Sequence, residues 1–318
     1  MKWSAALILI ALAGCARTTE VRIAVQPPST NNYPTHFAQW LGFFKDEGVD
    51  VSLSQIAGAS KVLEAVVGRS ADIGGGVYEQ AIQMAAEGRE VVSFVSVLRS
   101  PNFAILARVK TPAGLKGKVV GVSSPGSPSQ FYVNHLLLTA GLSPADVSIT
   151  GIGMGATAVA ALEHGQVDAA TLFGSAIPEA QSRCADAVML ADSRTPEGLR
   201  AALGVDDYPA SCLLARGDWL RANPDKARRI ARAVLRSLAW IHAHSAEEIL
   251  ARVPAEFRVG DTAAELGAIR LAKTMYSTDG RIKPESVEAV RRVLAESLER
   301  VRDAKIDLSR TYTNEFVQ

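Results

Sequence analysis

The sequence predicts an α/β protein made of two strand-and-helix units, and three observations support this. Segments with the pattern of short strands alternate with segments of helical periodicity from residue 21 to about residue 207. The alternation restarts near residue 109, after a first run of four strands. Aromatic residues make up only 6% of the chain, whereas alanine, valine, leucine and glycine are abundant, which suits helices packed closely on a sheet.

The first unit is predicted to follow the order βαβαβαβ, which favours a mainly parallel sheet with crossover helices. Its first strand alternates in polarity and ends at Pro27 and Pro28, and Gly48 is the expected stop of the first helix. The expected strands are 21–25, 49–53, 71–74 and 91–98, and the expected helices are 35–47, 58–67 and 78–87.

The second unit covers roughly residues 109–207 and repeats the same alternation. The apolar segment 210–215 is then expected to cross back toward the first unit. Within the second unit the expected strands are 119–122, 147–151 and 168–173, and the expected helices are 129–139, 157–164 and 177–184.

The remainder of the chain is predicted to be helical. Asn223 is expected to cap a helix that has Pro224 at its first position and Asp225 in its first turn. Lys283-Pro284-Glu285 is expected to open another helix. Both helices carry arginines opposite one apolar face, and we interpret these arginines as solvated surface.

Composition and motifs argue against several classes of function. The formal charge is +1, from 34 basic and 33 acidic residues, so there is no electrostatic argument for binding nucleic acid. The sequence has no Gly-x-Ser-x-Gly elbow, His-Glu-x-x-His pair or phosphate-binding loop. His242 and His244 stand two residues apart, which would turn their rings about 200° from each other on a helix. We therefore expect no metal, no cofactor and no catalytic residues.

The first fifteen residues have the pattern of an export signal. Lys2 precedes an apolar run of roughly ten residues, about half of the ~20 that a membrane-spanning helix needs. Leu12-Ala13-Gly14-Cys15 follows and resembles a bacterial lipobox. That resemblance implies that residues 1–14 are removed and that Cys15 carries lipid, which would place the protein in the periplasm or outside the cell, anchored to a membrane. The alternative is an ordinary secretory signal in which the cysteine is coincidental.

Two further cysteines, Cys184 and Cys212, follow in the chain. An oxidising compartment permits a disulfide between them. Two buried free thiols are an equally good interpretation, because the sequence does not give the distance between their Cα atoms.

The candidate binding residues lie in the loops that follow the predicted strands. Ligands of open α/β sheets bind outside the carboxyl ends of the strands, and helix N-termini there favour anions. Glycine and serine in such loops also simply make turns, so the pattern is only moderately specific. Arg99 is a candidate counter-ion or a surface charge, and Phe173 a ligand contact or a core residue. The candidates are Asn31, Asn32, Tyr33, Gly58, Ala59, Ser60, Gly76, Tyr78, Arg99, Ser123, Ser124, Ser127, Gln130, Met154, Phe173 and Ser175.

One stretch reads Leu41-Gly42-Phe43-Phe44-Lys45-Asp46-Glu47-Gly48-Val49-Asp50-Val51. Together with several others it resembles the nitrate, sulfonate and taurine substrate-binding proteins of ABC importers, and the related binding proteins for thiamine-pyrimidine precursors. Ser70 departs from the pattern, since the family often has glycine there. The other matching stretches are 33–34, 70–74, 115–122, 140–147, 161–169 and 306–317.

The resemblance implies a two-lobed periplasmic-binding-protein fold of type II, in which each lobe is a mainly parallel sheet flanked by helices. Lobe 1 would comprise residues 21–106 and 212–318, and lobe 2 residues 107–211. The ligand would lie in the cleft between them, and a membrane permease would recognise the closed form.

The implied function is delivery of a small organic solute to an ABC importer by a monomeric, lipid-anchored protein. We expect an anionic solute of sulfonate or carboxylate type, with a neutral pyrimidine or aromatic compound as the alternative. A sensory module for a membrane receptor would use the same fold. An enzyme that makes the thiamine pyrimidine also has a related fold, but its cysteine-rich motif has no counterpart here.

Overall fold

The computed structural model describes residues 20–258 and 261–318. The predicted signal peptide and Cys15 lie outside these residues. None of the helices that the structure describes has the length and apolar character needed to cross a bilayer.

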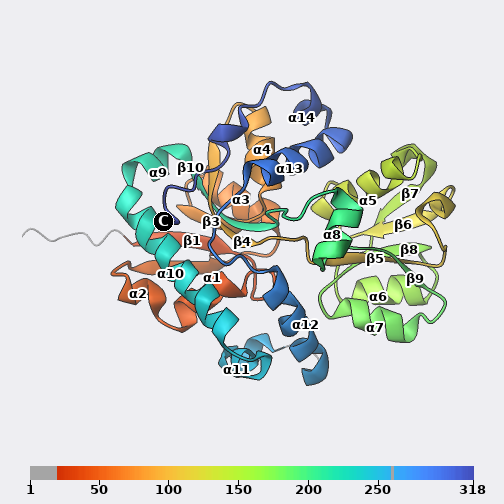
Figure 1. Cartoon of the computed structure of the whole chain (residues 1–318), viewed down its shortest axis with the longest axis horizontal. Helices are drawn as coiled ribbons and strands as arrows, with labels where there is room; N and C mark the ends of the chain where they lie inside the picture. Colours follow the sequence, from red (N-terminus) through yellow and green to blue (C-terminus); the bar gives the residue numbers. More distant parts are fainter. Residues whose placement is uncertain (1–19, 259–260) are drawn as a thin grey trace, which may run out of the picture.

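The first sheet combines parallel strands with one strand that returns from far along the chain (Figure 1). β1 pairs in parallel with β2 and β3, and β10 runs antiparallel between β3 and β4. The strand order is β2-β1-β3-β10-β4, with bounds β1 (Val21–Val25), β2 (Val51–Gln55), β3 (Ile73–Gly76), β4 (Val91–Leu98) and β10 (Ser211–Arg216).

The second sheet has the same plan. β6 pairs in parallel with β7 and β8, and β5 runs antiparallel between β8 and β9. The strand order is β7-β6-β8-β5-β9, with bounds β5 (Phe103–Ala107), β6 (Val119–Val122), β7 (Ser148–Gly151), β8 (Ala169–Phe173) and β9 (Val188–Asp192).

Helices cover both sheets, and a C-terminal series of helices packs mainly on the first (Figure 1). The N-terminal helices are α1 (Tyr33–Trp40), α2 (Phe43–Asp46), α3 (Ala59–Val67) and α4 (Glu79–Ala86). The second sheet carries α5 (Pro128–Thr139), α6 (Ala156–Glu163), α7 (Ala176–Arg183) and α8 (Pro196–Leu203). The C-terminal helices are α9 (Gly217–Ala222), α10 (Pro224–Ala243), α11 (Ala246–Arg252), α12 (Thr262–Met275), α13 (Pro284–Ser297) and α14 (Glu299–Asp303).

The alternation of elements is confirmed, with two differences. The helix expected over 35–47 is divided into α1 and α2, because Gly42 adopts the left-handed conformation with φ of 76°. β5, β9 and α8 were not predicted. In each sheet four strands run in one direction and one strand, β10 or β5, runs against them, so the prediction of mainly parallel sheets is confirmed. β5 begins within the residues assigned to lobe 1, and its pairing with β8 and β9 places it in the second sheet.

Asn223 stands at the start of α10 as predicted, but its side chain does not cap that helix. Its Nδ2 instead donates to the carbonyl of Trp219, 3.0 Å away, in the preceding helix α9. The short connection between α9 and α10 makes this earlier carbonyl an available partner, and Pro224 still fixes the first turn of α10.

The two sheets share part of their hydrophobic core. One cluster joins Ile82 of α4 and Leu294 of α13 with Phe103 and Val133 on the side of the second sheet. Helix α13 lies against α5 (Figure 1), where Nδ2 of Asn134 donates to the hydroxyl of Ser297 at 2.9 Å. His135 Nδ1 and Glu296 Oε2 are 2.8 Å apart beside this bond. The two halves are therefore firmly packed along the α5–α13 side.

The two cysteines that the structure describes are both free and buried. Cys184 follows α7 on the second sheet, whereas Cys212 lies in β10 of the first sheet. Of the two interpretations of the sequence, the structure favours two buried thiols.

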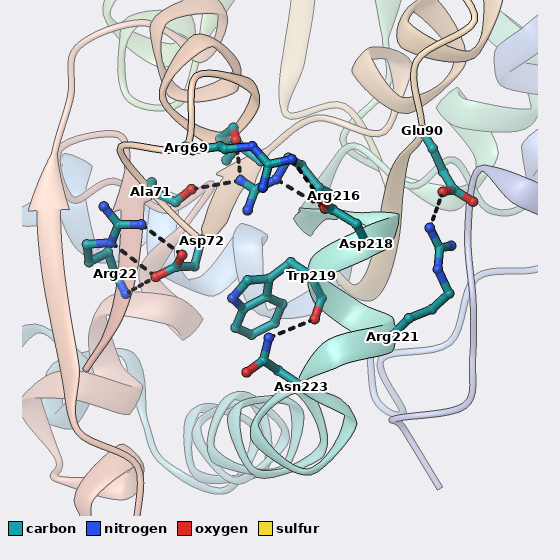
Figure 2. A network of polar contacts seen from close by, with 11 residues as sticks. Arg22, Arg69, Ala71, Asp72, Glu90, Arg216, Asp218, Trp219, Arg221 and Asn223 are labelled. Atoms are coloured by element: carbon teal, nitrogen blue, oxygen red, sulfur yellow. Dashed lines mark hydrogen bonds and ion pairs between the residues drawn. The ribbon is translucent and has the colours of Figure 1, made fainter. Parts of the chain in front are cut away.

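A network of arginines lies where β1 and β3 begin and β10 ends (Figure 2). Arg216 is its most enclosed member, with a side chain 13% exposed. It donates to the carbonyls of Val66 at 2.6 Å and Ala71 at 3.3 Å, and so satisfies backbone groups at the end of α3. Arg69 pairs with Asp218 in the same network, but both of these side chains are well exposed.

We expect Arg216→Ala to lower the free energy of unfolding by about 1–3 kcal/mol, because it removes charged donors from the carbonyls of Val66 and Ala71 in a partly buried place. Arg69→Ala is the matched control and should cost less than about 1 kcal/mol, since exposed ion pairs contribute little. Urea denaturation of both variants checks this. Equal losses for the two substitutions would contradict the assigned role of Arg216.

Candidate functional site

The strand register places several loops at one edge of the second sheet. Phe103 pairs with Phe173, and Ala104 pairs with Asp192. Asn102 therefore lies beside the residues that follow β8 and β9, because β5 runs antiparallel to both strands. The carboxyl ends of β6 and β7 face the same way, since both strands are parallel to β8.

A cavity of about 730 Å³ opens between this edge and helix α12. Residues of helix α7 line one side of it, and residues of α12, which belongs to the C-terminal series, line the other. Figure 1 shows where these two helices lie. Small residues give the α12 wall a smooth surface. The lining residues are Asn102, Gly174, Ser175, Pro178, Glu179, Gln181, Ser182, Arg183, Arg194, Asp261, Ala263, Ala264, Gly267, Ala268 and Leu271.

Asn102 connects this cavity with the loop that follows β1. Its Nδ2 donates to Oδ1 of Asn31 at 2.8 Å and to Oγ1 of Thr30 at 3.2 Å. The hydroxyl of Tyr276, at the end of α12, donates to the Thr30 carbonyl at 2.6 Å. The loop after β1 is thus fixed both by the segment that joins the sheets and by the helix that forms the cavity wall.

The two arginines that line the cavity are paired with acids. Arg194 donates to both carboxylate oxygens of Asp192, at 2.8 and 2.6 Å. Arg183 pairs with Glu163 at 3.3 Å and with Glu179 at 3.1 Å. The pKa of Asp192 lies below its usual range despite the opposing effect of burial, because Arg194 stabilises the carboxylate. The positive charge at the cavity wall is therefore already compensated.

Among the predicted site residues, Ser175 lines the cavity, and Asn31 accepts a hydrogen bond from Asn102, which also lines it. Asn32 is buried and shapes its own loop, since it accepts from the backbone of Ser29 at 2.8 Å. Tyr33 is also buried, packed against Phe37, and burial raises the pKa of its hydroxyl to about 12.

The serine loop after β6 satisfies its own polar groups. The hydroxyls of Ser123, Ser127 and Ser129 bond one another at 2.8 to 3.1 Å. Gln130 accepts from the backbone of Gly126 at 2.7 Å. Ser124 is exposed, and Met154 in the loop after β7 is 59% exposed. None of these residues lines the cavity between α7 and α12, although their loops lie at the same sheet edge.

Gly76 and Tyr78 lie in the core rather than at a ligand surface. Tyr78 is fully buried and its hydroxyl bonds that of Thr311, so it does not cover a ligand as we expected. A Cβ on Gly76 would stand 2.4 Å from Oε1 of Gln80 and 2.8 Å from Cδ1 of Leu214, so a larger residue there would displace these side chains. Phe173 is partly buried, with its ring 5.4 Å from that of Phe103.

The start of α3 has a structural contact of its own. Gly58 precedes α3 with φ of 96°, and the carbonyl of Ala59 accepts from Nε2 of Gln80 at 2.8 Å. Ser60 is exposed. These three predicted residues do not line the cavity.

Arg99 anchors the return segment between the sheets instead of facing the cavity. It forms an ion pair with the buried Asp207, whose other oxygen accepts from the hydroxyl of Ser286 in α13 at 3.0 Å. The counter-ion role expected for Arg99 thus goes to a carboxylate of the same chain.

Sequence reasoning missed Asn102, Arg194 and the whole α12 wall. The segment Ser100-Pro101-Asn102 follows β4 directly, so a search at strand ends could have found Asn102. No local pattern indicates that α12 would lie opposite α7, because that contact depends on the tertiary arrangement.

Glu79 is a buried carboxylic acid beside the return segment. Its Oε1 accepts from the hydroxyl of Tyr208 at 3.1 Å, and its Oε2 has no partner among the described residues. Burial raises the pKa of Glu79 to about 7, although the bond from Tyr208 acts in the opposite direction.

A model of the family described as "NMT1/THI5 like" matches residues 29–248. The chain belongs to this family. The Bacillus subtilis protein YtlA, whose name describes a binding protein, is 24% identical over 91% of this chain and 88% of its own. A solved structure from Bordetella bronchiseptica is 35% identical, covers 94% of this chain and 95% of its own, and has a TM-score of 0.83.

The alkanesulfonate-binding protein SsuA of Xanthomonas axonopodis, solved with bound MOPS, has a TM-score of 0.68 at 17% identity. It covers 92% of this chain and 98% of its own, and it confirms the periplasmic-binding-protein fold. The Saccharomyces cerevisiae protein THI13 is 23% identical over 67% of this chain and 64% of its own. Its name is that of a synthase for 4-amino-5-hydroxymethyl-2-methylpyrimidine phosphate.

We expect the ionisation of Glu79 to lower the stability of the wild-type protein as the pH rises from about 5 to 8. The folded state holds the Glu79 proton up to a pKa of about 7, whereas the unfolded chain releases it near the ordinary value of 4.5, so raising the pH favours unfolding. The full effect is on the order of 3 kcal/mol. Glu79→Gln cannot ionise and should remove this fall.

Urea midpoints measured across this pH range check the prediction. Glu64→Gln, an exposed position on α3, is the control and should follow the wild type. If Glu79→Gln also followed the wild type, Glu79 would not be the titrating group.

Proposed function

We propose that this protein is an extracytoplasmic, lipid-anchored binding protein that delivers a small organic solute to an ABC permease. One observation carries the proposal: a cavity of about 730 Å³ lies between two sheets, and the chain passes between these sheets twice. A cavity of this size suits a small molecule. Family membership and the binding-protein fold of the structural neighbours support the same interpretation.

The packing suggests how the two sides of the cavity close on a solute. They are held together along the α5–α13 contact, while α7 and α12 face each other across the cavity. Closure would then swing α7 toward α12 about the packed side, as in hinge motions of two-lobed binding proteins. Such a closed form is what a permease would recognise.

Binding rather than catalysis fits the residues that the structure describes. They contain no group of three or more histidines, cysteines or acids placed to hold a metal ion. Both described cysteines are buried, and burial raises the pKa of each thiol, which disfavours the nucleophilic thiolate. The synthase name of the yeast relative is the reason to test turnover alongside binding.

The solute class in this proposal is a small organic anion of sulfonate or carboxylate type. The N-terminus of α7, which has no side-chain cap at Ser175, and the sulfonate-binding neighbour support an anionic group. A neutral pyrimidine or aromatic compound is the second candidate, because the arginines of the cavity are already paired. A sensory role would use the same cavity, and the proposed monomer would be anchored through Cys15 in either role.

A thermal-shift screen with sulfonates, nitrate, aromatic carboxylates and pyrimidines tests the proposal. A solute at a hundredfold excess over its dissociation constant should stabilise the folded protein by about 2.7 kcal/mol, which raises the melting temperature visibly. Ser175→Trp should weaken solute binding about tenfold, because the indole ring would fill part of the cavity.

Thr139→Trp is the matched control for the bulky substitution. Thr139 is exposed at the far end of α5 from the sheet edge that borders the cavity, so its variant should bind like the wild type. Binding that survives Ser175→Trp unchanged would place the solute elsewhere.

A further inference from the structure

The side chain of Asn102 is the most enclosed uncharged polar group that lines the cavity. Asn102 is only 5% exposed. It belongs to the short segment that leaves β4 and enters β5, so its backbone is fixed by strands on both sides. A polar side chain held in this way normally has its hydrogen-bonding groups matched by partners.

The hydrogen bonds of Asn102 account for one end of its amide. Nδ2 has two N–H groups, and these donate to Asn31 and Thr30. Oδ1 accepts no hydrogen bond from the residues that the structure describes. It is nevertheless absent from the polar atoms that protein encloses completely, so it keeps accessible surface, and the space that Asn102 borders is the cavity.

The neighbouring charged groups do not supply the missing donor. The guanidinium groups of Arg194 and Arg183 are held by Asp192, Glu163 and Glu179, and neither donates to Oδ1 of Asn102. The cavity thus presents an open acceptor, while the arginines of its wall are directed at carboxylates of the same chain.

We infer that Oδ1 of Asn102 accepts a hydrogen bond from the solute, so that the solute carries an N–H or O–H group at this point. The inference rests on the proposed function and deepens it, because it selects among small organic molecules by a donor rather than by charge. A solute without such a donor would leave a nearly buried acceptor unpaired when the cavity closes, and this costs free energy.

Matched probe pairs test the inference, each pair differing by one amino group replaced with methyl. The pairs are 4-aminobenzenesulfonate with 4-methylbenzenesulfonate, 4-aminobenzoate with 4-methylbenzoate, and 4-amino-2-methylpyrimidine with 2,4-dimethylpyrimidine. Calorimetric titration of the wild type should give about tenfold tighter binding of the amino member in the pair that binds. In Asn102→Leu the two members should bind with nearly equal affinity.

Asn31→Ala separates this role from a structural one. It removes an oxygen that accepts a hydrogen bond from Nδ2 of Asn102, but it leaves Oδ1 of Asn102 in place. The variant should therefore preserve the preference for the amino member, even if both affinities fall. A preference that persists in Asn102→Leu overturns the inference. So does tighter binding of the methyl member in the wild type, the result expected if the amide pointed its nitrogen at the cavity.

Failure of every probe would count against the proposed solute classes, and a second measurement then decides the inference by itself. Crystals soaked in formamide offer a small N–H donor to the cavity. Formamide nitrogen within hydrogen-bond distance of Asn102 Oδ1 supports the inference. Formamide bound elsewhere in the cavity, or its carbonyl oxygen against Asn102, overturns it.

Discussion

The architecture depends on two strands, β5 and β10, with which the chain enters the second sheet and returns to the first. The chain leaves the first sheet after β4 and immediately becomes β5, which is paired on both sides in the second sheet. It returns as β10, which is paired on both sides in the first sheet. Each segment between the sheets therefore ends in an interior strand whose backbone groups are satisfied by two neighbours. The ends of these segments are held rigidly, and the residues between them lie at the cavity.

This arrangement explains why polar residues between the sheets are tied to their surroundings so closely. The hydroxyl of Ser193, after β9, donates to the carbonyl of Pro101 in the outgoing segment. On the return segment, Asp207 holds Arg99, and Tyr208 donates to Glu79. Buried polar groups that lacked such partners would cost free energy, so these bonds allow two polar connections to run through a largely apolar region.

Much of the fold could be predicted from sequence because its elements are local. Strands such as 21–25 and 91–98 carry alternating or continuous apolar patterns that end at prolines, glycines or charged residues. The sheet order could not be predicted in the same way, since the pairing of β10 with β3 and β4 joins segments far apart in the chain. β5 was missed for a related reason: its continuous apolar run is typical of a buried strand but equally of a helix segment.

In the candidate site, too, local sequence patterns predicted the position of a residue but not its tertiary surroundings. Residues such as Ser175 follow a strand directly, and the rule that ligands lie at carboxyl ends of strands found it. The same rule also selected Tyr78 and Gly76, which stand at a strand end but are buried in the core. Position along a strand gives the edge on which a residue lies. It does not give the direction of the side chain, which depends on packing against α4 and β10.

The partners of charged side chains also could not be predicted from their position along a strand. These partners bear directly on the kind of solute that the cavity accepts. Arg99 and Arg194 are adjacent to strand ends, where an arginine suggests an anion site. Each instead meets an acid of its own chain, Asp207 and Asp192. A solute in the cavity therefore meets neutral and accepting groups, and the arginines that line it are paired with acids. Selectivity at such a wall comes from hydrogen-bond matching, because a mismatched donor or acceptor loses its water without gaining a partner.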